Sequence, residues 1–345
     1  MIAPAPRTHI PALLRRRVLT LRTALPGLAL CAALAALAFA AHHLAGISAL
    51  SPLILAILLG MALNTMHPLP PCFAPGIAFS LRYVLRGGIV LLGLQLTFGQ
   101  VLSVGVSGLA LILVTLLATF AFTRWLGRRM GLPAGLTDLI AAGSSICGAS
   151  AVIAANTVTR ARDEDVAYAI ACVTIFGSAS MALMPLAAPL LSLGPKAYGL
   201  WTGASIHEVA QVVAAAFQQG DQAGHFGTIA KLTRVMMLAP MVLLLGLSSR
   251  NRPKKGESLG RAPLPWFVFG FIAMVGLAST GLVPAPMRDT STTLTQILLT
   301  VALAAMGLST DLRKLVAAGL RPAILGAAAW VFISGLSLLL VCLTQ

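Results

Sequence analysis

Two stretches of this sequence place small, hydroxyl-bearing and ionisable residues inside runs that are otherwise strongly apolar. The first, G-S-S-I-C-G-A-S-A-V-I-A-A at residues 143–155, contains Gly143, Ser144, Ser145, Cys147, Gly148 and Ser150. The second, G-A-S-I-H-E-V-A-Q-V-V-A-A at residues 203–215, repeats much of the pattern without a gap and adds His207, Glu208 and Gln211. Backbone that glycine loosens must find partners in protein or in a water-filled cavity when it lies in hydrocarbon. We therefore expect the two stretches to face each other across a solute site.

The first stretch suits a small solute, and an anion in particular. A helix that breaks there frees N–H groups beside the hydroxyls of Ser144, Ser145 and Ser150, and the positive end of a half-helix favours negative charge. The alternative is a tight helix–helix seam, because small residues let transmembrane helices approach closely. A seam needs small residues on one face only, whereas here they occupy consecutive positions, which favours the broken helix.

The pair His207-Glu208 invites a comparison with metalloprotease sites. Those sites use H-E-x-x-H, with two histidines one helical turn apart on zinc, but the second position here is Gln211. We therefore predict no metal site. In a transporter, His207 and Glu208 can carry a coupling proton, although oxygen ligands at this place can also bind Na⁺. The remaining alternative is a His–Glu pair that only fixes helix packing.

Lys231 and Arg234 lie three positions apart, on one face of an expected helix and near its outer end. We expect them to raise the local concentration of an anion above the site. The alternative is that their charged ends extend to the lipid headgroups.

The composition of the chain indicates that these stretches belong to a membrane protein. The chain of 345 residues is 58% hydrophobic and 10% charged, whereas soluble domains carry about 25% charged residues. Its net charge of +15 does not indicate a nucleic-acid partner, because the basic residues gather in short loops between apolar runs. The five cysteines have no paired or metal-binding spacing. They are Cys31, Cys72, Cys147, Cys172 and Cys342.

We count eleven apolar runs that are long enough to span a bilayer, which takes about 20 residues. They are approximately 24–45, 48–66, 84–103, 106–126, 135–157, 166–192, 198–218, 227–248, 264–283, 291–310 and 322–343. Residues 1–46 form a basic leader and an extra first helix, for which a cleaved signal peptide is the alternative. Alternating the spans from a cytoplasmic N-terminus leaves most basic residues inside, as the positive-inside rule requires. Arg160 and Arg162 then lie outside and Lys196 inside.

The ten remaining spans divide into two sets of five, at residues 47–192 and 193–345. An odd number of spans per set inverts the second set, which is the arrangement of many secondary transporters. An offset of 148 residues, which aligns Leu85-Arg86 with Thr233-Arg234, places Ser144-Ser145 opposite Thr292-Thr293. We therefore expect 291–310 to be the second broken helix, crossing the first. Two likenesses do not follow this offset, namely 143–155 with 203–215 and 93–97 with 307–311. We interpret both as shared local chemistry.

Five ordered motifs resemble one family of bacterial inner-membrane proteins. They are L-R-G-G-I-V-L-L-G (85–93), G-S-S-I-C-G-A-S-A (143–151), G-A-S-I-H-E-V-A-Q (203–211), K-L-T-R-V followed by L-A-P (231–240) and G-L-S-T-D-L (307–312). Together they resemble the YeiH-like family, which is named for sulfate export, over nearly the whole chain. The resemblance implies a relation to cation/proton antiporters and anion transporters, with an inverted five-helix repeat, two crossing broken helices and elevator-like movement. It also implies a sulfate or sulfonate-type solute.

These observations predict an all-α, multi-pass protein of the cell inner membrane with a cytoplasmic N-terminus. We expect a secondary active transporter for a small anionic solute, coupled to H⁺ or Na⁺, and neither an enzyme nor a cofactor-binding protein. The competing classes are an anion channel, which needs a continuous polar pore, and an intramembrane enzyme. A homodimer is compatible with the sequence. The predicted solute-binding residues are Gly143, Ser144, Ser145, Cys147, Gly148, Ser150, His207, Glu208, Gln211, Lys231, Arg234, Thr292 and Thr293.

Overall fold

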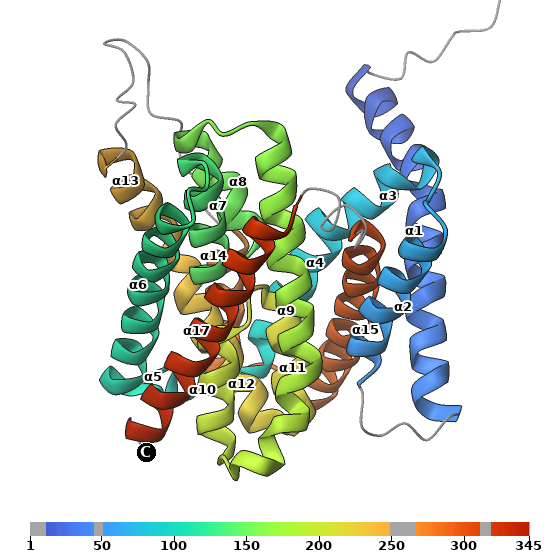
Figure 1. The fold of residues 1–345 in the computed structure, drawn as a ribbon. Helices are drawn as coiled ribbons and strands as arrows, with labels where there is room; N and C mark the ends of the chain where they lie inside the picture. Colours follow the sequence, from blue (N-terminus) through green and yellow to red (C-terminus); the bar gives the residue numbers. More distant parts are fainter. Residues whose placement is uncertain (1–11, 45–50, 249–265, 311–318, 345) are drawn as a thin grey trace, which may run out of the picture.

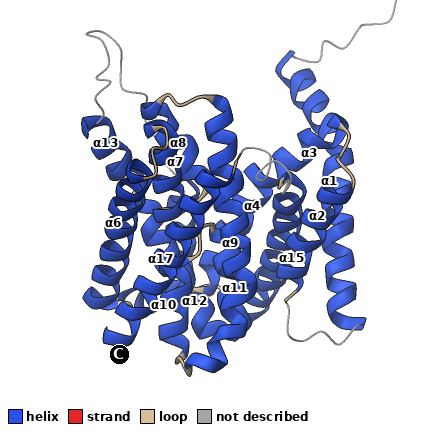
Figure 2. Ribbon diagram, in the orientation of Figure 1, coloured by secondary structure: helices blue, strands red, loops and turns tan. Residues whose placement is uncertain are grey.

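The computed structural model of the chain describes residues 12–44, 51–248, 266–310 and 319–344. Within these ranges the chain consists of helices and turns without a strand (Figure 2), which confirms the all-α class. In the described part of the chain, seven continuous helical segments are long and apolar enough to cross a membrane. The start of the basic leader, the loop 249–265 and the charged segment 311–318 lie outside the described residues.

The helices pack into two bundles (Figure 1). The scaffold bundle comprises α1 (Ala12–Leu44), α2 (Pro52–Met66), α3 (Ala74–Phe79), α4 (Leu85–Leu92), α14 (Trp266–Ser279) and α15 (Ala285–Ser309). The π-helical segment Ser80–Val84 joins α3 to α4, and 3₁₀ turns at Pro71–Phe73 and Gly93–Gln95 extend them into one membrane-length rod. A short helix, α5 (Phe98–Leu102), leads from this rod to the second bundle.

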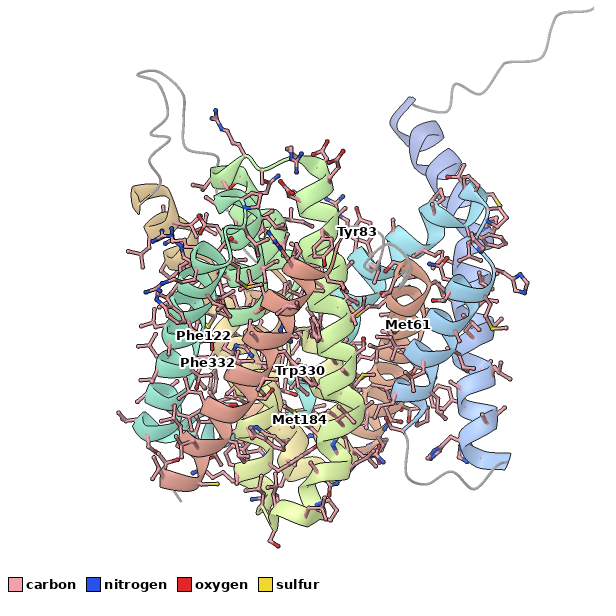
Figure 3. The ribbon with its side chains drawn as sticks, viewed as in Figure 1. Met61, Tyr83, Phe122, Met184, Trp330 and Phe332 are labelled. Carbon is pink, nitrogen blue, oxygen red and sulfur yellow. The ribbon has the colours of Figure 1, made fainter. Side chains whose placement is uncertain are left out.

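The core bundle holds both of the stretches that the sequence singled out. It comprises α6 (Gly105–Arg129), α7 (Ala134–Ser145), α8 (Ala149–Thr159), α9 (Asp163–Leu191), α10 (Pro195–Ser205), α11 (Val209–Ala216), α12 (Asp221–Met236), α13 (Leu238–Ser248) and α17 (Leu320–Thr344). Aromatic rings fix α17 against its neighbours: Phe332 stacks on Phe122 of α6 at 4.1 Å between ring centroids, and Trp330 lies 5.6 Å from Phe176 of α9 (Figure 3).

Glycines let the scaffold helices pack backbone to backbone. A Cβ at Gly307 of α15 would collide with the Ile57 carbonyl of α2, and one at Gly60 of α2 would lie 2.6 Å from the Ala304 carbonyl. Helices in lipid associate through such close approach, because apolar burial gives them no driving force there. The helix α15 runs unbroken from Ala285 to Ser309, so the helix break expected in 291–310 is wrong.

The pairs α7–α8 and α10–α11 are helical hairpins. A Cβ at Gly135, near the start of α7, would lie 2.9 Å from the Cβ of Ala161, just beyond the end of α8. In the second pair the Tyr198 hydroxyl of α10 donates to the Ala215 carbonyl of α11 at 3.1 Å. A helix that continued in one direction through its break would hold these residues far apart, since each residue adds about 1.5 Å. The chain therefore reverses at each break.

This folding corrects the expected topology. The segments 135–157 and 198–218 each return to the side from which they start, so they are not two of eleven full crossings. The first hairpin starts where α6 ends, the second starts where α9 ends, and α9 runs between these two sides. The two hairpins thus enter from opposite sides. Arg160 and Arg162 consequently share a side with Arg128, while Lys196 lies on the other, the reverse of the expected arrangement.

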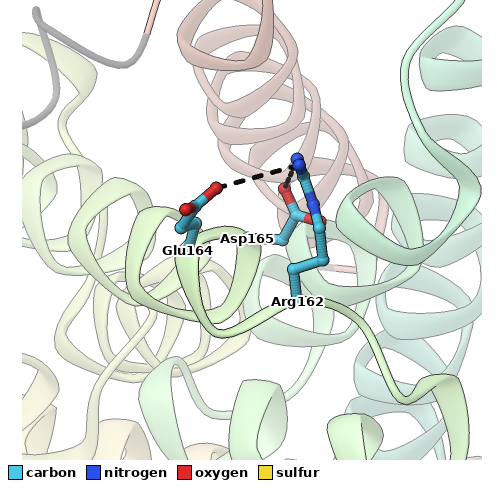
Figure 4. A network of polar contacts seen from close by, with 3 residues as sticks. All are labelled: Arg162, Glu164 and Asp165. Carbon is cyan, nitrogen blue, oxygen red and sulfur yellow. Dashed lines mark hydrogen bonds and ion pairs between the residues drawn. The ribbon is translucent and has the colours of Figure 1, made fainter.

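The acidic run Asp163–Asp165 forms the first turn of α9. Negative charge at a helix N-terminus is favourable because of the helix dipole. Arg162 lies 3.3 Å from Asp165 and 3.8 Å from Glu164 (Figure 4). These local ion pairs lie at the start of α9.

Candidate functional site

The tips of the two hairpins meet inside the core bundle. The first tip is residues 146–148, between α7 and α8, and the second is residues 206–208, between α10 and α11. Gly148 has a φ of +67°, and a Cβ there would collide with the carboxylate of Glu208. Only glycine satisfies both demands, which explains why the first tip needs this residue.

Glu208 joins the two tips through its carboxylate. Its Oε1 accepts the backbone N–H of Ala149 in the first hairpin at 2.6 Å. The same side chain caps its own helix by accepting the backbone N–H of Gln211. A carboxylate that bridges the N-termini of α8 and α11 satisfies free amides and complements two helix dipoles at once.

Lys231 of α12 binds backbone carbonyls of both tips. Its Nζ donates to the carbonyls of Ile146 and Ile206, both at 2.8 Å, and to the carbonyl of His207. The side chain is completely buried. Three carbonyls match the three N–H groups of an ammonium, so this lysine is fully engaged with backbone from both hairpins.

Arg234 lies one turn further along α12, is completely buried and is equally engaged. Its Nε and Nη2 donate to the Ser145 carbonyl at 3.1 and 2.9 Å, and Nη2 also donates to Ser144 at 3.1 Å. Its Nη1 donates to Gly203 at 3.1 Å and to Ile206 at 3.0 Å. These bonds use all five N–H groups of a guanidinium. They cover the carbonyl ends of α7 and α10, where positive charge is favoured.

The structure therefore changes the expected placement of both cations. They lie deep in the protein, where the sequence predicted a position near the outer end of a span. Because their donors bind the tips, neither is free to extend to the headgroups. They neutralise the carbonyl ends of two half-helices, and Glu208 occupies the amide ends.

Gln211 connects the second hairpin to both bundles. Its Nε2 donates to the Thr174 carbonyl at 3.2 Å and the Ser178 hydroxyl at 3.1 Å, both on α9. The same nitrogen lies 3.8 Å from the sulfur of Met306 on α15. The sequence analysis did not identify Thr174 and Ser178 as partners of Gln211. Two hydroxyl residues four positions apart in an apolar run could have indicated a polar contact there.

His207 differs from its neighbours. The side chain is completely buried, and neither ring nitrogen has a hydrogen-bond partner among the described residues. Buried polar groups almost always have partners, so the hydrogen-bonding capacity of this imidazole is unused at the hairpin tip.

The predicted site residues fall into two groups. Those of the hairpins and α12 lie at the tips or within two helical turns of them: Gly143, Ser144, Ser145, Cys147, Gly148, Ser150, His207, Glu208, Gln211, Lys231 and Arg234. Ser144 and Ser145 serve through their carbonyls, and the Ser145 hydroxyl donates back to Ala141. Thr292 and Thr293 lie on the scaffold, where their hydroxyls donate to carbonyls one turn back in α15.

A cavity of about 370 Å³ lies between the scaffold and the second hairpin. Thr292, Gln95 and His43 line it on the scaffold side, and Val213 and Gln218 line it on the side of the second hairpin. Thr292 thus faces the boundary between the two bundles, and Thr293 does not contribute to the cavity lining.

Comparison with known proteins agrees with the resemblance of the motifs. The family described as "Conserved hypothetical protein 698" matches residues 26–326. The inner membrane protein YeiH of Salmonella typhi is 40% identical over 323 residues, which cover 90% of this chain and 92% of the relative. YeiH of Escherichia coli K12 is 38% identical over 334 residues, or 93% and 95% of the two chains. The chain belongs to the YeiH family.

The YeiH-family relatives are described as UPF0324 inner membrane proteins. A further relative, a UPF0324 membrane protein of Pseudomonas aeruginosa, is 40% identical over 90% of this chain and 92% of its own. These descriptions and the apolar helices identify this YeiH-family chain as a multi-pass inner-membrane protein.

Proposed function

We propose that the chain is a secondary active transporter, not an enzyme, that moves a small anionic solute across the inner membrane by alternating access. The observation that carries the proposal is the meeting of two oppositely inserted hairpins whose tips are both tied to α12 by Lys231 and Arg234. Transporters commonly build solute sites from discontinuous helices whose ends meet inside the bilayer.

The charge balance at the tips supports an anion such as sulfate or a sulfonate. Two buried cations, Lys231 and Arg234, face one buried carboxylate, Glu208. Uncompensated charge is costly in a low-dielectric interior, and a bound anion would remove the excess. The imidazole of His207 is the polar side chain at the second tip that is left to contact a solute or a proton.

An inverted repeat also supports transport, with its second half in a different chain order from the expected one. The first unit runs α2, the α3–α4 rod, α6, the first hairpin and α9. The second begins with its hairpin and runs α10–α11, α12, α14, α15 and α17. Corresponding elements run in opposite directions and have corresponding neighbours: α2 packs on α15, and α4 packs on α14.

Matched glycines agree with this correspondence. Gly93 packs against the Phe271 carbonyl of α14, as Gly307 packs against α2. Gly105 and Gly319 precede or begin the corresponding helices α6 and α17, with φ values of +68° and +100°. Among the described residues we infer nine crossing elements and two hairpins in place of eleven spans.

The cytoplasmic side is inferred from charge. Arg124, Arg128, Arg129, Arg160, Arg162 and Arg321 lie near the side where the first hairpin is based, which α1 shares with its N-terminal end. Lys196 and Arg288 lie at the other side. Positive charge gathers in cytoplasmic loops, so the first hairpin enters from the cytoplasm and the second from outside.

The two hairpins differ in how the scaffold covers them. Val213 of α11 is 4% exposed, whereas Ile153 at the equivalent position of α8 is 55% exposed. The helix α11 packs on α2 and α15, whereas the main neighbours of α8 are α7, α9 and α13. Broken symmetry at this boundary is what alternating access requires, and we propose that in this state the scaffold holds the second hairpin and leaves the first uncovered.

This state predicts a difference in thiol accessibility. In a background carrying Cys72→Ser and Cys342→Ser, which removes the exposed thiols, Ile153→Cys should react with a charged, water-soluble thiol reagent. Val213→Cys should react about tenfold more slowly, because thiol reactivity follows exposure. Mass spectrometry of the labelled protein measures both rates. Equal rates, or an unreactive Ile153→Cys, would contradict a first hairpin that the scaffold leaves uncovered.

Flux measurements test the proposed function itself. Purified protein in liposomes should take up radiolabelled sulfate, taurine or succinate in a saturable manner, driven by an imposed ion gradient. Electrical current that is ohmic and needs no gradient coupling would instead support an anion channel. Absence of flux for every anion, with cationic or neutral solutes carried instead, would contradict the anionic solute.

A further inference from the structure

The hairpin tips present backbone oxygens in the manner of a cation site. The carbonyls of Ile146, Ile206 and His207 come from both hairpins and converge on a single atom, Nζ of Lys231. Unwound carbonyls and half-helix ends are the groups that coordinate Na⁺ in many secondary transporters. Here the ammonium of Lys231, which is part of the chain itself, occupies the position that such a Na⁺ ion would take.

We propose that the ammonium of Lys231 is the resident cation of the hairpin tips and that transport is therefore independent of sodium. This inference rests on the proposed function, because it concerns the ion to which transport is coupled. It removes the alternative of Na⁺ and leaves protons, or the solute gradient alone, to drive the cycle.

The other oxygen atoms at the tips are engaged as well. Arg234 donates hydrogen bonds to the carbonyls of Ser144, Ser145 and Gly203. The carboxylate of Glu208 accepts N–H groups from both hairpins. Hard cations such as Na⁺ need several oxygen ligands at once, and the described part of the tips has no such set left open. Nor do its titratable side chains form a metal-binding group.

Covalent attachment has a mechanical consequence. A diffusible cation would leave the tips in part of each cycle, whereas Lys231 stays bound to α12 and keeps both hairpins with it. The tips and α12 are then expected to move as one body, with the solute site between them and the scaffold.

Thermal unfolding of the purified protein in detergent tests the inference without a transport assay. A ligand that binds only the folded state raises the melting temperature with its concentration. We expect wild-type protein to melt at the same temperature in sodium, potassium and choline chloride of equal ionic strength. Lys231→Ala should melt lower and gain a saturable, cation-specific rise of several degrees with sodium or methylammonium. Lys196→Ala, at an outer lysine, should behave like wild type.

A saturable stabilisation of the wild-type protein by sodium over potassium and choline would overturn the inference. So would a folded Lys231→Ala variant whose melting temperature responds to cations no more than that of Lys196→Ala. If Lys231→Ala fails to fold, the wild-type comparison still decides. Replacing sodium by choline in the flux assay adds a transport measurement, and flux that stops without sodium also contradicts the inference. If no anion is carried at all, the proposed function fails while the stability comparison keeps its meaning.

Discussion

Glu208→Gln is expected to abolish gradient-driven anion flux while leaving the hairpins folded. The amide keeps an oxygen that can accept the Ala149 N–H, now at 2.6 Å from Oε1, but the negative charge between the tips is lost. Lys231 and Arg234 then lack their buried counter-charge, which costs several kcal/mol per unpaired ion. We expect flux to fall by about 100-fold or more, the factor that corresponds to about 2.7 kcal/mol of this cost in the moving step of the cycle, at about 1.36 kcal/mol per tenfold in rate. Uptake of labelled sulfate, taurine or succinate into liposomes measures the effect.

Two further variants serve as controls for Glu208→Gln. Glu164→Gln removes a carboxylate whose side chain is 84% exposed at the start of α9, and flux should not change. Glu208→Asp keeps the charge but shortens the reach to Ala149, so part of the flux should return if charge is what matters. Wild-type flux in Glu208→Gln would mean that the carboxylate serves only to cap α11 and join the tips.

The sequence predicted which stretches meet but not how they are folded. The likeness of 143–155 and 203–215 correctly indicated a facing pair, and the hydrogen bond from Ala149 to Glu208 joins them. Counting spans then assigned 291–310 as the partner of 143–155, but this segment belongs to an unbroken helix. A run of about 20 apolar residues is long enough to cross the bilayer, but the same run can also turn back at its middle. Length and hydropathy alone do not separate these two outcomes.

One local signal did point to the reversal. Gly148 stands at the centre of its run and adopts a φ of +67°, which L-residues with side chains rarely tolerate. In the second run, no such glycine marks the turn, because residues 206–208 are extended or act as a cap. Only the first hairpin therefore had a backbone signature in its sequence.

The order of the likenesses also had a physical meaning that span counting obscured. The pairs 93–97 with 307–311 and 143–155 with 203–215 nest within each other along the chain. Two tandem repeats in the same order cannot produce nesting, but a second unit that begins at its hairpin does. Gly93 and Gly307 then pack on α14 and α2 in the same manner. We propose that the shared local chemistry of these segments reflects their corresponding places in the two units.

The roles of Lys231 and Arg234 could not be predicted from the sequence. Their partners are backbone carbonyls up to 90 residues away along the chain, and a carbonyl acceptor leaves no mark in residue type. The sequence correctly placed Lys231 and Arg234 on one helix, α12. The partners, and hence the role as internal ties, depend on tertiary structure.

Arg234→Ala is expected to cause the largest loss of stability of any single change at this site, about 4 kcal/mol or more. Removing one side of a buried charged network costs about 3–5 kcal/mol. Each of the carbonyls of Ser144, Ser145 and Gly203 that is left without a donor adds a desolvation penalty of about 1–3 kcal/mol. Arg234→Lys keeps the charge but has three donors in place of five, so we expect an intermediate loss. Chemical unfolding in detergent micelles measures all three proteins.

Arg128→Ala is the matched control, because this arginine is exposed at the end of α6 and surface changes usually stay within about 0.5 kcal/mol. Equal stability of Arg234→Ala and Arg128→Ala would show that the guanidinium does not hold the tips. Hydrogen exchange adds a spatial test. Because the guanidinium binds carbonyls of α7 and α10 together, its loss should increase exchange at residues 146–148 and 206–208 in parallel. An increase confined to one tip would mean that the hairpins are held independently, which contradicts a core that moves as one body.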